Sequence, residues 1–265
     1  MPCISSHWLK TMLDSPAECY RKHLDPMRPV QQPTAAMQFG MLIHCLTLTP
    51  LQFGEEFIID TGNRRTKAGR AHHAALSETG LIVISPNDFE RAQAIVAVLK
   101  ADPDAGKLLK GGKKERTLIQ PRKDGLLPLK ARLDSYHEAK RQVVELKTTH
   151  SLSGIRTTMQ RYRYPLSAAF YRELAKALTV VFIFVETREP YDVNVFEMSR
   201  LDLQEGREQW QSALKRFDEC WLANQWPEAE PTPDMDDDLL MMNFMPPAAK
   251  NNPGRFDLPV GELAL

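Results

Sequence analysis

Apolar positions along the chain follow two spacings, one typical of helices and one typical of strands. Phe39, Leu42, Ile43 and Leu46 recur every three or four residues before Pro50, which predicts a helix that stops ahead of the proline. The same patterns, with their turn residues, predict further elements. Predicted helices cover residues 5–13, 35–48, 67–78, 86–100, 165–177 and 203–223, and predicted strands cover 81–84, 116–120, 129–136, 142–148, 180–185 and 191–196.

Composition places the chain among soluble globular proteins. It has 265 residues, of which 43% are hydrophobic and 26% are charged, so it can bury a full core as one large domain or two small ones. No apolar run approaches the roughly 18 residues that a membrane span needs, and no N-terminal signal pattern is visible. The four cysteines, Cys3, Cys19, Cys45 and Cys220, form no CxxC pair, which favours reduced cytoplasmic thiols over a zinc or iron–sulfur site.

Charge is spread unevenly, although 34 basic and 34 acidic residues cancel over the whole chain. Residues 100–163 hold 16 Lys and Arg against 7 Asp and Glu, a net of +9, whereas residues 202–265 hold 5 against 13, a net of −8. A basic block is usually a solvated surface, and it becomes a phosphate-binding footprint only where it surrounds a site. The zero total therefore does not exclude a nucleic-acid partner.

The character of the sequence changes after Trp226, where prolines and aspartates accumulate. We therefore predict a domain over residues 1–230 and an acidic, proline-rich C-terminal tail over residues 231–265. An apolar segment at 239–245 interrupts the acidic tail. It leaves two interpretations open, a strap packed on the domain or a docking peptide for a partner.

Two of the predicted strands carry the candidate chemistry. Alternation along a strand places Glu145 and Lys147 on one face, and pairing of the two strands can bring Asp134 beside them. Converging carboxylates repel one another unless a cation neutralises them, and Mg²⁺ or Mn²⁺ does so with oxygen ligands, to which the Leu146 carbonyl can add. Lys147 would then help to orient a water that attacks a phosphodiester. On any exposed hairpin the same residues can instead be solvated charges.

A histidine lies in the helix predicted at 35–48. Gly40 precedes His44 by four residues and therefore shares its helix face, which leaves space beside the imidazole for an ion or a strand. A lone histidine in an apolar helix is more often a core residue. Beside an acidic hairpin, His44 becomes a candidate metal ligand or a group that supports one.

Five blocks, in order over residues 4–227, resemble the PD-(D/E)XK nuclease superfamily, and within it the exonuclease VIII-type and phage lambda exonuclease-type recombination nucleases. The blocks are residues 4–9 with 14–16, residues 39–46, residues 63–69, Asp134 with residues 145–149, and residues 162–171. The resemblance implies an α/β (α+β) fold, with the restriction-endonuclease-like core of a central mixed β-sheet flanked by helices.

The same resemblance implies an activity and partners. It implies a nuclease with two Mg²⁺ or Mn²⁺ ions per site that degrades the 5′ strand of linear double-stranded DNA from its ends, in the 5′ to 3′ direction. The 3′ overhangs would serve single-strand annealing recombination with an annealing protein. It further implies a homo-oligomeric ring, trimer or tetramer, of a bacterial or phage-encoded cytoplasmic protein with no membrane partner. The alternatives are a DNA endonuclease of the same fold and a non-catalytic recombination scaffold.

Site roles follow from the resemblance position by position. His44, Asp134, Glu145 and the Leu146 carbonyl would be metal ligands, and Lys147 would be the catalytic lysine. Further predicted contacts to the terminal or backbone phosphates and to a frayed end are Ser6, Arg64, Arg65, Arg132, Arg161, Arg163, Tyr162 and Tyr164. For the arginines and tyrosines, plain surface charge and helix packing are the alternatives.

One departure concerns the helix after the nuclease motif. The family carries a glutamine four residues before an aromatic residue, whereas this chain has Ser167 ahead of Tyr171. Either the glutamine role is lost, Ser167 partly replaces it, or Gln160 reaches in.

Overall fold

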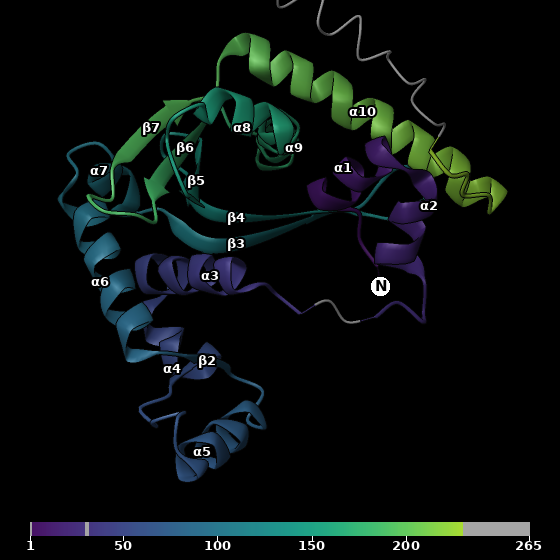
Figure 1. The fold of residues 1–265 in the computed structure, drawn as a ribbon. Helices are drawn as coiled ribbons and strands as arrows, with labels where there is room; N and C mark the ends of the chain where they lie inside the picture. The colour runs from purple at the N-terminus through teal and green to yellow at the C-terminus, as the bar shows by residue number, and fades with distance from the viewer. Residues whose placement is uncertain (1, 30–31, 230–265) are drawn as a thin grey trace, which may run out of the picture. The chain divides into compact units, whose positions relative to one another are not determined.

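The structure, a computed structural model, describes residues 2–29 and 32–229, so the tail predicted at 231–265 lies outside the described residues. Its centre is a five-stranded sheet in the order β3-β4-β5-β6-β7 (Figure 1). The strands are β3 (Lys113–Gln120), β4 (Leu129–His137), β5 (Gln142–Thr149), β6 (Thr179–Glu186) and β7 (Val193–Glu197). Because β5 and β6 pair in parallel while the other neighbours are antiparallel, the sheet is mixed, as predicted.

Helices cover both faces of this sheet (Figure 1). One face packs against α1 (Ser6–Asp14), α9 (Tyr164–Ala175) and α10 (Arg200–Ala223), and the other against α3 (Ala35–Leu48), α6 (Pro86–Ala101) and α7 (Ala105–Leu109). Side chains of β5 alternate accordingly: Val143 joins the first core, and Val144 and Leu146 join the second. Glu145 and Lys147 therefore point toward the face that α1 and α9 cover.

Shorter elements complete the described part of the chain. Next to α1 lie α2 (Pro16–Cys19) and a π-helix (Tyr20–Leu24), and a 3₁₀ turn (Pro50–Gln52) and α4 (Phe53–Glu56) follow α3. A parallel pair, β1 (Phe57–Ile59) and β2 (Ile82–Ile84), encloses α5 (Lys67–Ser77), and α8 (Ile155–Arg161) with α9 makes the crossover from β5 to β6. Among the described residues no helix combines the length and apolar character that a membrane crossing requires.

Helix ends follow from local chemistry. Thr34 caps α3 through its side chain, and Ser199 and Asp202 form a reciprocal capping box at the start of α10. The prediction for residues 35–48 is confirmed. The helix predicted to run through residue 177 instead ends at Ala175, because Lys176 adopts the left-handed conformation with φ 51°.

Other predicted elements also differ in extent. The strand predicted from residue 191 begins at Val193, because Tyr191 has a φ of 64°. The strand predicted from residue 116 begins at Lys113, three residues earlier. Cys19, Cys45 and Cys220 are buried thiols that form no disulfide, as predicted.

Candidate metal-dependent active site

The candidate site lies where β4 and β5 separate. The ladder between these strands runs from His137 opposite Gln142 to Ser135 opposite Val144. Beyond that pair, carboxylate oxygens replace backbone carbonyls as the acceptors between the two strands. The Asp134 amide donates to Glu145 Oε1 at 3.3 Å, and the Leu146 amide donates to Asp134 Oδ2 at 2.8 Å. The opening of the ladder thus fixes two carboxylates side by side.

Lys147 joins the two carboxylates. Its Nζ lies 3.0 Å from Glu145 Oε2 and 3.5 Å from Asp134 Oδ2. The predicted convergence of Asp134, Glu145 and Lys147 is therefore present in the structure. Glu145 is 2% exposed, so its charge is held under the surface by the lysine and by one backbone amide.

Burial and the neighbouring charges shift the pKa values of Glu145 and Lys147. Burial raises the pKa of Glu145, Asp134 raises it further, and Lys147 opposes the rise. Burial acts to lower the pKa of Lys147, but the charges of Asp134 and Glu145 outweigh it, so the pKa is raised. The lysine is therefore a firmly charged ammonium, and the carboxylates need more positive charge than it supplies.

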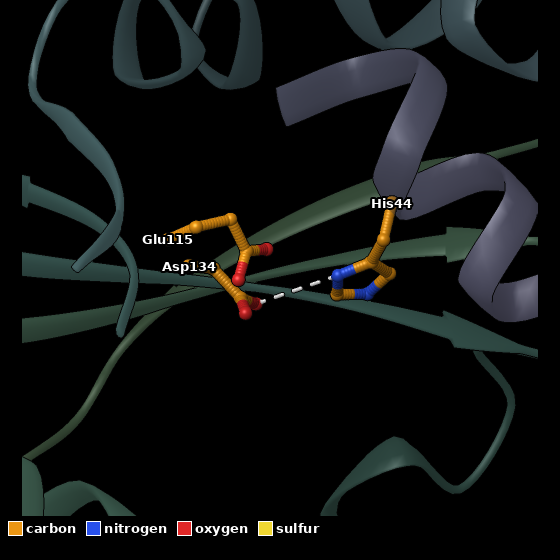
Figure 2. A group of neighbouring side chains, drawn as sticks. All are labelled: His44, Glu115 and Asp134. Atoms are coloured by element: carbon orange, nitrogen blue, oxygen red, sulfur yellow. Dashed lines mark ion pairs between the residues drawn. The ribbon is translucent and has the colours of Figure 1, made fainter. Parts of the chain in front are cut away.

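His44 and Glu115 approach Asp134 from other elements. Figure 2 shows the His44 ring extending from α3 toward the carboxylates of Asp134 and Glu115. One ligand atom from each of these residues lies within 4.8 Å of the others, and His44 Nδ1 is 3.8 Å from Asp134 Oδ2. Burial lowers the pKa of His44, partly offset by Asp134, so the imidazole is neutral near pH 7 and can act as a ligand.

Glu115 was not predicted from the sequence. It lies between Lys114 and Arg116, whose partners are Ser135 and Leu133, so its register position is opposite Asp134. Its φ of 49° is unusual for a residue with a side chain, and such strain is typical of functional sites. Strand alternation alone could have indicated Glu115 only if the strand had been predicted to begin before residue 116.

The donor set fits a hard or borderline divalent cation. Two carboxylates and a neutral imidazole suit Mg²⁺ or Mn²⁺, and the facing acids repel one another without a cation. Burial raises the pKa of Glu115, while the ion pair with Arg132 opposes the rise. The candidate ligand group is therefore His44, Glu115 and Asp134, with Glu145 adjoining it through the Asp134 amide.

Gly40, four residues before His44, allows helix α3 to pack closely against strand β5. A Cβ at Gly40 would lie 3.1 Å from Thr148 Oγ1, so α3 packs closely on the end of β5 at this point. This close packing brings His44 to the β4–β5 fork, the point where the two strands separate beyond Ser135 and Val144. The Leu146 backbone, predicted to provide a carbonyl ligand, lies close enough to the His44 ring to oppose the lowering of its pKa.

A cavity of about 1260 Å³ opens over these residues. His44, Glu115, Asp134 and Lys147 line it, and so do the predicted DNA contacts Arg161, Tyr162 and Tyr164. Arg132 lines it too, while its guanidinium pairs with Glu115.

A second cavity, of about 420 Å³, adjoins through Arg132. Ser6 and Tyr171 line it, and the Ser6 hydroxyl donates to the Tyr171 hydroxyl at 3.2 Å. Burial raises the pKa of Tyr171 to about 12, so the phenol keeps its proton. The structure thus places Ser6 and Arg132, both predicted to contact a phosphate, around one cavity next to the carboxylates.

The remaining predicted residues lie elsewhere. Gln160 is an exposed residue of α8 that lines neither cavity, whereas Ser167 is buried in α9. Arg64 binds the buried Asp60 at 2.9 Å, which makes it a structural anchor before α5, and Arg65 is exposed on the same segment. Neither arginine lines the main cavity.

Two further basic groups stand near the fork on its α1 side. Arg163, a predicted phosphate contact, donates to Asp14 Oδ1 at 2.6 Å and to the Lys10 carbonyl at 3.3 Å. Lys10, which was not predicted, holds its Nζ 5.3 Å from the centre of the Tyr164 ring. Burial, with Lys147 adding to it, lowers the pKa of Lys10 to about 7. No carboxylate of the described residues forms an ion pair with Lys10.

The fold and the fork are those of a PDDEXK-like domain. Residues 5–231 match the family model of the PDDEXK-like domain of unknown function (DUF3799), and the chain belongs to this family. The resemblance seen in the sequence is thereby confirmed at the level of the superfamily. No curated protein sequence matches the chain.

Solved structures include similar folds. A protein of Eubacterium rectale named "Putative exonuclease" superposes with a TM-score of 0.58 at 15% identity, over 98% of this chain and 91% of that one. A phage related exonuclease from Haemophilus somnus 129PT gives a TM-score of 0.33 at 11% identity, over 60% of this chain and 85% of that one. At 15% identity the first similarity shows the fold alone, and at a TM-score of 0.33 the second carries no inference.

Proposed function

We propose that this protein is a Mg²⁺- or Mn²⁺-dependent exonuclease that degrades the 5′ strand of linear double-stranded DNA, 5′ to 3′, and leaves 3′ overhangs. The observation that carries the proposal is the β4–β5 fork, where Asp134, Glu145 and Lys147 meet His44 and Glu115. The 5′ polarity rests on the resemblance of the sequence blocks to exonuclease VIII-type and lambda-type enzymes. The name of the Eubacterium rectale neighbour supports an exonuclease.

Each side chain has a role in this proposal. A divalent cation held by His44, Glu115 and Asp134 would supply Lewis-acid chemistry, and a second ion beside Glu145 would complete a two-metal site. Lys147, a stable ammonium, donates to a phosphate oxygen and offsets charge that develops there. In the adjoining cavity, Ser6 and Arg132 hold the terminal phosphate of the strand.

Labelled DNA tests the proposal. Linear duplexes carrying a label at the 5′ or the 3′ end, and a closed circle, are incubated with Mg²⁺ or Mn²⁺. We expect early release of the 5′ label and an intact circle. A cut circle would favour the endonuclease alternative, and the absence of cleavage with either ion would contradict a nuclease.

Single substitutions assign the roles. Lys147→Ala and Asp134→Asn should lower the cleavage rate by about 100-fold or more, because the first removes the ammonium aimed at the reacting phosphate and the second removes a candidate metal ligand. Duplex binding measured without turnover should change little. Lys215→Ala, an 81% exposed lysine on α10, is the matched control and should cleave at the wild-type rate.

A further inference from the structure

An exposed tyrosine stands at the edge of the main cavity. Tyr162 follows α8 directly, the residue is 55% exposed, and it lines the cavity that Asp134 and Lys147 also line. Single exposed apolar side chains are common and need no special explanation. What distinguishes Tyr162 is the support beneath its ring.

The ring of Tyr162 is the outer member of an aromatic stack. It stacks on Tyr164 with a centroid distance of 6.0 Å and an interplanar angle of 24°. Tyr164 stacks in turn on Phe182, which is fully buried in β6, at 5.4 Å and 17°. The sheet core therefore holds the orientation of Tyr164, and Tyr164 holds that of Tyr162. Such a rigid ring loses little freedom when it binds a flat partner.

The turn between the two tyrosines is also held in place. Arg163, between them, adopts the left-handed conformation with φ 48° and ψ 50°. A side-chain-bearing residue keeps this conformation only where its surroundings enforce it. Here the Arg163 guanidinium is fixed to Asp14 and to the Lys10 carbonyl of α1. The clamp fixes the turn from which both tyrosine rings project, so Arg163 is a positioning residue for them.

Basic side chains flank the stack. The Arg161 guanidinium lies 6.0 Å from the Tyr162 ring centre, and the Lys10 Nζ lies 5.3 Å from the Tyr164 ring centre. Aromatic faces alternating with cations are the chemistry that binds single-stranded nucleic acid, because bases stack while phosphates meet the charges. A paired duplex offers no free base face except at its end.

We propose that Tyr162 is a stacking platform for an unpaired base of the DNA strand whose phosphate lies in the main cavity. This inference rests on the proposed nuclease function and adds to it a feature of the substrate, a terminal base separated from its complement. Because every base has an aromatic face, the platform distinguishes unpaired from paired ends without selecting a sequence.

A fluorescent base tests the platform without turnover. A duplex carrying 2-aminopurine at its frayed 5′ end is titrated with the full-length protein in Ca²⁺, and cleavage in Mg²⁺ is measured separately. Wild type and Tyr162→Phe should quench the fluorescence. Tyr162→Leu should lose the quenching and weaken binding by about 5- to 100-fold, the range for one base–aromatic stack.

Two controls separate stacking from other effects. Trp221→Leu removes a 38% exposed ring that stacks on Phe217 outside the cavity, and it should behave as wild type. On a duplex whose terminal bases are replaced by abasic sites, wild type should bind no better than Tyr162→Leu.

Equal quenching and affinity of wild type and Tyr162→Leu, with matching melting temperatures, would overturn the platform. Tyr162-dependent quenching in a protein that fails to cleave DNA would support the platform while refuting the proposed nuclease function.

Discussion

At the scale of single residues, the site is a set of charges that the backbone forces together. Asp134 and Glu145 each accept a backbone amide of the neighbouring strand, so neither can move away from the other. Lys147 supplies one positive charge for both. A divalent cation between Asp134, Glu115 and His44 is the simplest group that relieves the remaining repulsion.

The residue roles were only partly predictable. Asp134, Glu145 and Lys147 follow from alternation along two paired strands, a rule that depends on sequence alone. Glu115 was not found in this way, because the predicted strand began at residue 116 and so left out the first three residues of β3. Lys10 was missed because its nearness to Lys147 depends on how α1 packs over the sheet.

Lys10 should make stability depend on pH. The unfolded chain holds this proton up to the ordinary pKa of 10.5, but the folded chain releases it near 7, since burial and then Lys147 disfavour the charge. Between these values a rise in pH therefore favours the folded state. Relative to wild type, Lys10→Met should melt higher at pH 6.5, and this advantage should shrink between pH 7 and 10.

Calorimetric scans of both proteins across that pH range measure the Lys10 effect. Lys215→Met, which removes an exposed lysine on α10, should show no such convergence. A melting-temperature difference between Lys10→Met and wild type that stays constant from pH 6.5 to 10 would contradict the lowered pKa.

At the scale of elements, periodicity predicted long helices and central strands well and short elements poorly. The helix Ala35–Leu48 was predicted with its observed bounds, because its apolar stripe and the following proline are both local signals. The short β1 and α8 carry too few periodic positions for such a prediction. The opening between β4 and β5 is a tertiary effect, since it needs side chains that replace ladder hydrogen bonds.

The contact between α9 and α10 depends on one glycine. A Cβ at Gly206 would lie 2.0 Å from the Pro165 carbonyl oxygen, so any side chain there must push the two helices apart. We expect Gly206→Ala to cost about 1–3 kcal/mol or more. For a domain of this size, each kcal/mol of lost stability lowers the melting temperature by about 2–4 °C.

Thermal melts of Gly206→Ala check the packing. Gly54→Ala, at a helical glycine with open space around it, serves as the control and should melt at or slightly above the wild-type temperature. An unchanged melting temperature for Gly206→Ala would show that α9 and α10 do not pack as closely as described.

At the scale of the whole molecule, the neutral total charge conceals a basic block of +9 over residues 100–163. This block includes Arg132, Lys147 and Arg161, which line the main cavity. DNA binding should therefore weaken steeply as salt concentration rises.

The homo-oligomeric ring, trimer or tetramer, and the single-strand annealing partner stay predictions. Light scattering of the purified protein measures its oligomeric state.

Removing residues 230–265 should leave cleavage of naked DNA unchanged, because every candidate site residue lies before that point. The cut belongs after Ala229, since the Trp226 ring packs edge-on against Phe217 and the Pro227 carbonyl accepts the Ala17 amide. Rates on linear duplex for the full chain and for the truncated chain, with melting temperatures for both, provide the comparison. Lost cleavage in a truncation that melts like the full chain would assign those residues to catalysis.

The most direct measurement is Mn²⁺ binding by calorimetry to wild type, Glu115→Gln and Asp134→Asn. Because Glu115 and Asp134 are candidate ligands, we predict that each variant binds at least about 10-fold more weakly. Each should also lose most of the Mn²⁺-dependent rise in melting temperature. Glu55→Gln, at a cavity residue outside the ligand group, should bind as wild type does. Equal Mn²⁺ affinity in wild type and both ligand variants would contradict a metal site at the β4–β5 fork.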